Sequence, residues 1–300
     1  MVTTLLYLFF VYITYHPLKT LKLVDKENST PIAYANVILD NKQCIYSDLN
    51  GFIKIPYGGK EIRISHICYN DTILSISNIE SDSIFLLQKS INLPLLQITN
   101  KQNKKYKPQK IGYTNYKTCI SQGGRTGYEL AVYIPYDKKI CSNKYIHSII
   151  ADLYYDNTPV KGGNIYNADI RFDLRPVKYI NGTIIPDNIS LISGGLIYNG
   201  KKKSGIRIVN LQKPIIFPKN GVFIIAEWIY SKQLPLNDFL DVHVNTTIEV
   251  PFEYTMFKDP FITKDKWLYL RNIPEGIHAN IKIKSQNKIR NAKLGLIVNK

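Results

Sequence analysis

Two glutamates stand inside strongly apolar runs of this 300-residue chain, and they are the side chains best placed for chemistry: Glu129 and Glu227. Two carboxyl groups about 5 to 10 Å apart across a cleft can hydrolyse a glycosidic bond. A buried carboxylate is otherwise costly unless it is paired. A structural ion pair with a buried arginine, such as Arg171 or Arg207, is therefore the stronger expectation for each glutamate.

Other catalytic patterns are missing from the sequence. None of the five histidines has a glutamate three residues later, as a zinc peptidase would need, and there is no Gly-x-Ser-x-Gly elbow. The segment 123–127 (Gly-Gly-Arg-Thr-Gly) lacks the ending of a phosphate loop and predicts a hairpin loop. The segment 48–51 predicts a tight turn rather than a calcium loop. The sequence thus predicts no enzyme, no metal and no cofactor.

Tyrosine is abundant, with 22 residues, and is concentrated in the first half of the region after residue 110. Tyrosines on an exposed sheet face can stack on sugars or contact a protein partner. Ordinary packing inside a β-sandwich is the alternative interpretation. The candidate ligand or partner surface consists of these side chains: Tyr113, Tyr116, Arg125, Tyr128, Tyr154 and Tyr166.

The chain carries a formal net charge of +16, and most of its basic residues are lysines. Of the 39 lysines and arginines only seven are arginines, which leaves 32 lysines. Arginine is favoured where phosphates are gripped in bidentate fashion. We therefore expect no nucleic acid as partner, and a basic surface that could face acidic glycans or other envelope proteins.

The four cysteines, Cys44, Cys68, Cys119 and Cys141, have no CxxC spacing. Bridges between Cys44 and Cys68 and between Cys119 and Cys141 would each stay within one domain. Isolated buried thiols are the equal alternative.

Residues 1–18 predict a degenerate signal peptide, since the apolar core from Leu5 to Ile13 is too short for a membrane helix of roughly 20 residues. No positive n-region or small-residue cleavage site accompanies it, so a buried first strand is the alternative. An exported protein of the periplasm, outer membrane or cell surface is expected, with no other transmembrane span.

Short alternating apolar runs and scarce helical periodicity predict an all-β chain. In the first part, strands are expected at Pro31–Leu39, Ser47–Ile55, Glu61–Tyr69 and Ser83–Leu87, with Asn50-Gly51 as a hairpin turn. In the second part, the strongest strands are Tyr128–Ile134, His147–Tyr155, Asp169–Pro176, Gly205–Leu211, Val222–Ile229 and Leu294–Val298. The run at Val222–Ile229 is the most apolar and predicts a central strand buried on both faces.

The first part resembles a known module. The Pro31-Ile32…Ala35-Asn36-Val37 strand, the Ser47-Asp48…Gly51-Phe52 turn and Ile64–Tyr69 are similar to the carboxypeptidase regulatory-like (transthyretin-like) domain of Bacteroidetes envelope proteins. The resemblance implies a small transthyretin-like β-sandwich. Most members carry glycine where this chain has Cys68.

The second part resembles the uncharacterised β-sandwich that follows this module in such proteins, through Gly127–Ala131, Val209–Leu211 and Pro218–Phe223. The resemblance implies a larger jelly-roll-like β-sandwich of unknown activity, with Asn210 where members use aspartate. The expected organisation is a signal peptide at 1–18, the module at 19–90, a basic linker at 91–110 and the second domain at 111–300.

These features together predict a non-enzymatic structural or interaction protein of the cell envelope. The alternatives are a carbohydrate-binding protein of a glycan-uptake system and, less favoured, a glycoside hydrolase that uses Glu129 and Glu227.

Overall fold

The computed structural model describes residues 18–40, 43–56, 58–89, 107–156, 164–192, 195–198, 202–230, 239–259, 263, 266–270 and 289–299. The chain divides into two compact units: unit 1 comprises Met1–His66 and Asn70–Gln88, and unit 2 comprises Ile67–Tyr69 and Lys89–Lys300. The predicted signal peptide lies outside the described residues, apart from Leu18. Most of the predicted linker does too, while strand β8 already begins at Gln109.

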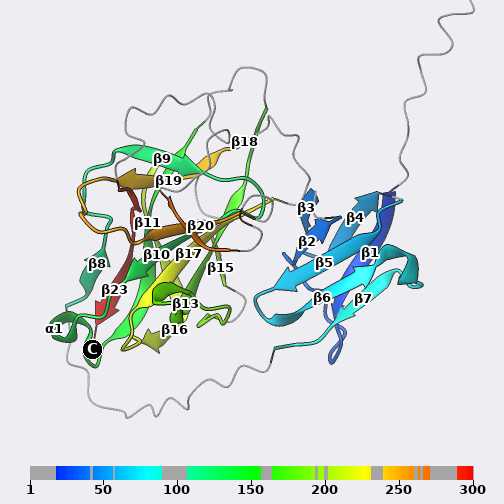
Figure 1. Ribbon diagram of the computed structural model, residues 1–300, viewed down its shortest axis with the longest axis horizontal. Coiled ribbons are helices and arrows are strands. Elements are labelled where there is room, and N and C mark those ends of the chain that lie inside the picture. The colour runs from blue at the N-terminus through cyan, green and yellow to red at the C-terminus, as the bar shows by residue number, and fades with distance from the viewer. Residues whose placement is uncertain are drawn as a thin grey trace, which may run out of the picture. The chain divides into compact units, whose positions relative to one another are not determined.

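Unit 1 consists of two small sheets that enclose an apolar core (Figure 1). One sheet has the order β4-β1-β7, with β1 (Leu18–Asp25), β4 (Phe52–Pro56) and β7 (Ser83–Leu86). The other has the order β3-β2-β5-β6, with β2 (Asn36–Leu39), β3 (Gln43–Tyr46), β5 (Glu61–His66) and β6 (Tyr69–Ser75). A 3-10 turn, η1 (Ile76–Asn78), follows β6. Alternate residues such as Leu23, Ile55 and Ile64 are fully buried, as half-buried strands require.

Unit 2 has two larger sheets, named here after their central strands. The β17 sheet has the order β14-β13-β17-β10-β20-β21, and β15 also pairs with β13. Its strands are β10 (Glu129–Ile134), β13 (Asp169–Ile180), β14 (Thr183–Pro186), β15 (Leu196–Tyr198), β17 (Val222–Ile229), β20 (Thr255–Lys258) and β21 (Leu268–Tyr269).

The β11 sheet has the order β22-β19-β11-β23-β8, with β16 paired to β11 and β9 paired to β19. Its strands are β8 (Gln109–Gly112), β9 (Ile120–Gly123), β11 (Tyr145–Tyr155), β16 (Gly205–Ile216), β19 (Val242–Thr247), β22 (Asn291–Ala292) and β23 (Leu294–Asn299). A separate pair joins β12 (Ile165–Tyr166) to β18 (Phe239–Leu240), and α1 (Lys138–Cys141) is a single helical turn.

The inner faces of these two sheets pack into one core. The β17 sheet contributes Leu130, Phe172 and Trp228, and the β11 sheet contributes Leu153 and Leu296 among others. The fold is therefore all-β, with a small sandwich-like unit followed by a larger one, which confirms the predicted fold class. Strand β17 is buried along its whole length between β13 and β10, so the prediction of a central strand is also confirmed.

Both predicted hairpins are wrong, because each turn instead carries the chain from one sheet to another. After Asn50-Gly51, β4 pairs with β1, whereas the preceding β3 pairs with β2. The turn itself is present: Asp48 Oδ1 accepts the backbone N–H groups of Asn50 and Phe52 at 2.9 and 2.8 Å. Residues 123–127 likewise connect β9 of the β11 sheet to β10 of the β17 sheet.

Several strand limits differ from the prediction. The strand expected at Gly205–Leu211 continues through Pro214 to Ile216. The strand expected at Glu61–Tyr69 ends at His66, and the one expected from Ser47 begins at Phe52. The segment Pro31–Leu39 forms a strand only from Asn36, since Tyr34 has a positive φ of 57° that interrupts extended backbone. Strand β13 does not end at Pro176 but continues to Ile180, with Pro176 opposite Val222 of β17.

Candidate functional site

Four charged residues form a straight row across the β17 sheet. Glu129 lies directly opposite Lys258 of β20 on one side and opposite Glu227 of β17 on the other, and Glu227 lies opposite Arg171 of β13. Successive side chains of a strand point to opposite faces. Because their sequence neighbours point into the sandwich core, the four charges lie on the outer face of this sheet.

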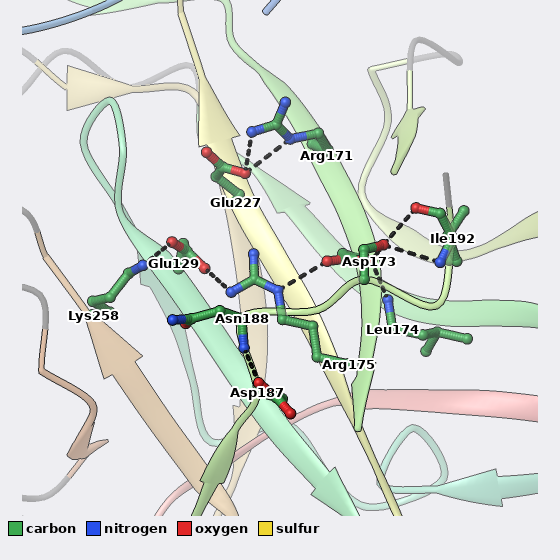
Figure 2. Close-up of polar contacts among 11 residues, drawn as sticks. Glu129, Arg171, Asp173, Leu174, Arg175, Asp187, Asn188, Ile192, Glu227 and Lys258 are labelled. Atoms are coloured by element: carbon green, nitrogen blue, oxygen red, sulfur yellow. Dashed lines mark hydrogen bonds and ion pairs between the residues drawn. The ribbon is translucent and has the colours of Figure 1, made fainter. Parts of the chain in front are cut away.

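Two further charges extend the row along β13 on the same face. Asp173 and Arg175 follow Arg171 at intervals of two residues, which keeps all three on one side of the strand. Figure 2 shows these side chains converging from β10, β13, β17 and β20. The resulting charge cluster contains Glu129, Arg171, Asp173, Arg175, Glu227 and Lys258.

Direct ion pairs connect the members of the charge cluster. Arg171 donates to Glu227 Oε2 from Nε at 2.9 Å, and its Nη2 lies 2.7 Å from the same oxygen. Lys258 Nζ lies 2.5 Å from Glu129 Oε1. The expectation that each glutamate pairs with a buried arginine is confirmed for Glu227, whose partner is Arg171, one of the two candidates.

Arg175 connects the other two acids, as Figure 2 shows. Its Nη1 lies 2.9 Å from Glu129 Oε2, an ionic contact without hydrogen-bond alignment, and its Nε donates to Asp173 Oδ2 at 2.9 Å. Arg207 was the wrong candidate for a buried partner. Its guanidinium donates to the backbone carbonyl oxygens of Ile206 on β16 (2.9 Å) and of Ser204, the residue before β16 (3.3 Å).

The charge cluster is almost completely withdrawn from water. Glu129 is 7% exposed, Asp173 2% and Arg175 9%. Ser190, in the segment after β14, covers one end and donates from Oγ to Asp173 Oδ1 at 2.5 Å. At the other end, Gly195 lies against the Arg171 side chain, where a β-carbon would come within 3.0 Å of Arg171 Cγ.

The electrostatics of the cluster keep Glu129 ionised. Burial by itself would raise the pKa of Glu129, but the charges of Arg175 and Lys258 lower it to about 2. Burial also raises the pKa of Asp173, an effect that Arg175 opposes only in part. For Arg175, burial acts to lower the pKa, yet Glu129 and Asp173 raise it above its ordinary value. A glycosidase acid needs a protonated carboxyl near neutral pH, and Glu129 is shifted in the opposite direction.

The structure separates the predicted tyrosines into core and surface residues. Tyr113 and Tyr128 belong to the core of unit 2: Tyr113 stacks on Tyr254 at 5.6 Å, and Tyr128 packs edge-on against Trp228 at 5.4 Å between ring centroids. Neither ring offers a face to solvent. Burial raises the pKa of both phenols.

The remaining predicted residues do not form one surface patch. Tyr116 is exposed and lies 6.4 Å from the Tyr113 ring, whereas Tyr154 is exposed on β11 beside His243. Tyr166 on β12 is half-buried against Tyr230 at 5.6 Å, and Arg125 is half-buried between β9 and β10.

The sequence did not suggest a cluster of polar side chains that lies around His243, on the outer face of the β11 sheet. His243 lies opposite both Tyr154 and Gly123, and its Nδ1 lies 3.2 Å from Ser121 Oγ. Burial lowers the pKa of His243, with Asp156 opposing the shift. This cluster could not be predicted from the sequence, because His243 and Gly123 come together only through the pairing of β19 with β9.

A second unpredicted group lies on the same sheet and is fully paired. Lys293 Nζ lies 2.5 Å from Asp152 Oδ2 and donates to Thr118 Oγ1 at 2.8 Å, while Asn245 donates to Asp152 Oδ1 at 3.0 Å. Within the described ranges, no three His, Cys, Asp or Glu side chains come together as metal ligands. The same part of the chain contains no helix long and apolar enough to cross a membrane. None of the four cysteines forms a disulfide, so the disulfide alternative is not the one observed.

Comparison with known proteins identifies no family. No protein-family model and no curated protein matches the chain. Among solved structures, the chain is similar to the cysteine protease and lectin-like domains of Cwp84, a surface layer associated protein of Clostridium difficile, with a TM-score of 0.36 and 10% identity. The match covers 93% of this chain and 62% of that one, so the chain spans less than two thirds of its length. A likeness at this level carries no functional argument.

Proposed function

We propose that this protein is a non-enzymatic structural or interaction protein of the cell envelope, with a carboxypeptidase regulatory-like module as unit 1. The observation that carries the proposal is the closed charge cluster. Glu129 and Glu227 are the two acids best placed for hydrolysis, and each is held by an arginine on the face where a substrate would have to bind. The cluster contains three cations and three carboxylates, so its charges balance.

Further support comes from what the cluster does for the fold. Its ion pairs join four neighbouring strands of the β17 sheet by side-chain contacts in addition to the backbone ladder. Removing one partner of a buried ion pair typically destabilises a protein by about 3 to 5 kcal/mol. The acids therefore act as structural residues of a scaffold. The export and the envelope location belong to this proposal through the resemblance of unit 1.

The proposal is tested with Glu227→Gln and Glu129→Gln. We expect both variants to unfold at lower urea concentration than the parent protein, and the parent to release no reducing sugar from a panel of acidic and neutral polysaccharides. Asp187→Asn, which changes a half-buried carboxylate directly after β14 and outside the charge cluster, is the matched control. Polysaccharide hydrolysis by the parent that disappears in both glutamine variants would overturn the proposal.

Carbohydrate binding without hydrolysis is the second candidate, and one observation favours it. Lys258 Nζ lies 5.4 Å from the centre of the half-buried Trp267 ring, and Tyr269 follows on the adjacent strand β21. The indole ring supplies apolar area for stacking, and the ammonium group beside it attracts acidic groups. Affinity electrophoresis through gels with acidic polysaccharide decides the matter: retardation that Trp267→Ala abolishes would support this candidate, and unchanged migration at millimolar sugar would remove it.

A further inference from the structure

Strand β16 forms an edge of the β11 sheet. It is 12 residues long and pairs with β11 through Gly205–Leu153 to Ile216–Tyr145. Strand β11 uses its other side to pair with β23 and β19. Within the described residues, no strand pairs with the second side of β16. A long strand edge presents alternating backbone N–H and C=O groups and can accept one more strand.

The two halves of this edge differ in how open they are. The second half contains Lys213 and Pro214, and proline and lysine are the residues that protect an edge against pairing. The first half, Gly205–Asn210, contains no proline. An added strand is therefore expected on the first half only.

The side chains of the first half alternate between the core and solvent. Val209 and Leu211 pack against the core of unit 2. Ile206 and Ile208 point the other way and are 45% and 48% exposed, adjacent on one face of the strand. Cross-strand apolar pairs contribute roughly 0.2 to 1 kcal/mol each. Valine or isoleucine in a partner strand would cover these two side chains.

The segment that forms this edge is basic. Residues 202–221 contain five basic side chains and no acid: Lys202, Lys203, Arg207, Lys213 and Lys219. Two neighbouring acids are already paired: Asp152, opposite Ile206 on β11, with Lys293, and Asp241 with Lys202. The Arg207 guanidinium lies at the open half, bonded to the carbonyl oxygens of Lys203, Ser204 and Ile206. Acidic side chains in a partner strand would therefore be attracted to this edge.

The same charges disfavour a second copy of the chain as the occupant. Antiparallel pairing of two open halves would bring two copies of this basic segment, each with five cations and no acid, alongside one another. Like charges directly opposite each other destabilise a strand pair, and Pro214 cannot donate to the new ladder.

We propose that the open half of β16, Gly205–Asn210, binds an extended acidic peptide segment of a protein partner by strand addition. The inference rests on the proposed function, since it names the surface through which an envelope interaction protein would act. In the complex, alternate apolar residues of the partner cover Ile206 and Ile208. The partner's acidic residues lie near Arg207 and the neighbouring lysines, and its backbone continues the β11 sheet.

The test uses the full chain and a fluorescein-labelled, capped peptide of seven residues in which valine and glutamate alternate. Two control peptides keep the valines: one replaces glutamate by lysine, and the other carries N-methyl groups on alternate backbone nitrogens. Anisotropy at constant ionic strength should show saturable binding of the valine–glutamate peptide alone. Ile208→Glu replaces an apolar contact by a repulsive charge and should weaken binding at least about tenfold.

Ile73→Glu is the matched protein control, because Ile73 is an isoleucine exposed on β6 of unit 1 and is 60% exposed. It should bind the peptide as the parent does. Ile206→Glu gives a second variant if Ile208→Glu does not fold. Tryptophan fluorescence reports folding of unit 2, which contains both tryptophans, Trp228 and Trp267.

Three outcomes would overturn the inference. The first is no binding of the valine–glutamate peptide, or equal binding of the N-methylated one. The second is binding that Ile208→Glu leaves unchanged and that a single-stranded oligothymidylate displaces, which would indicate attraction of any polyanion to lysines. The third is a dimer of the protein alone that Ile208→Glu dissociates. The proposed function is tested separately, by polysaccharide hydrolysis and its dependence on Glu129 and Glu227. None of these three outcomes bears on hydrolysis, so each can overturn the inference while the proposed function stands.

Discussion

Replacement of Arg175 by methionine should destabilise unit 2 by about 3 to 5 kcal/mol at pH 7. Methionine keeps much of the side-chain volume but leaves the Glu129 and Asp173 carboxylates without their shared partner. The fall of the Glu129 pKa from 4.5 to about 2 is the net result of burial and of the nearby cations Arg175, Lys258 and Arg171. At about 1.4 kcal/mol per pKa unit it corresponds to about 3 kcal/mol for the ionised carboxylate in its whole setting, of which Arg175 supplies one part.

The pH dependence gives the sharper test. The folded-state pKa of Glu129 is lowered, so its stabilisation is present above about pH 4.5 and is lost as the pH falls through about 2. The pKa of Asp173 is raised by burial, so its contribution has the opposite sign and is lost as the pH rises. Without Arg175 both carboxylates should take up protons more readily. The difference in stability between parent and variant should therefore be largest near pH 7 and should narrow at pH 3.

Urea unfolding followed by tryptophan fluorescence measures this difference, because both tryptophans belong to unit 2. Arg207→Met is the matched control, since the Arg207 guanidinium donates to backbone carbonyl oxygens of its own segment, and its loss should cost less than about 1 kcal/mol. A loss below about 1 kcal/mol for Arg175→Met at pH 7 would refute the reasoning. So would a loss that is the same at pH 3.

Three further predictions concern a glycine, the cysteines and a histidine. Gly51→Ala should destabilise unit 1 by more than about 1 kcal/mol, measured by circular dichroism melting, because φ is +78° and the new β-carbon would lie 2.6 Å from the Leu23 carbonyl oxygen; an unchanged melting temperature would contradict this. In urea without reductant, Ellman's reagent should titrate all four thiols, whereas in the native protein Cys119, which is exposed, should react first; a count of two or fewer in urea would indicate disulfides. The NMR titration of His243 should give a pKa below the ordinary 6.5, with stability lost as the pH falls, and a value above 6.5 would show that the ring is not shielded from water as described.

Strands were predictable from the sequence where the pattern of burial is local. The run Val222–Ile229 is apolar throughout because both faces of β17 are covered, and no knowledge of its neighbours is needed to recognise this. The turns were predictable only in part. At Asn50-Gly51 the chain reverses as expected, but the strands on either side enter different sheets. Turn chemistry is set by a few adjacent residues, whereas strand partners are set by distant segments that share a core.

The candidate site shows the same limit. The expectation that each buried glutamate pairs with an arginine followed from the cost of burying a carboxylate, which any apolar strand reveals. Arg175 was not named as a partner, although the predicted strand Asp169–Pro176 includes it; only the strand's end at Pro176 was placed too early. Proline is tolerated here at a point where β13 continues beyond it to pair with β14. A usable signal was present: Arg171, Asp173 and Arg175 alternate with Ile170, Phe172 and Leu174, which predicts one charged face and one apolar face.

This alternation gives the charge cluster a role beyond stability, because it fixes the register of the sheet. Slipping β17 by one residue would turn Glu227 into the sandwich core and the fully buried Trp228 out of it. Trp228 would also lose the bond from its Nε1 to the Val242 carbonyl oxygen, 2.6 Å long, which ties β17 to the opposite sheet. A hydrophobic replacement of all six charges could retain stability, since buried ion pairs are often matched by well-packed apolar groups. It would remove the difference between the two faces of β10, β13 and β17, and with it the penalty that excludes the slipped pairings.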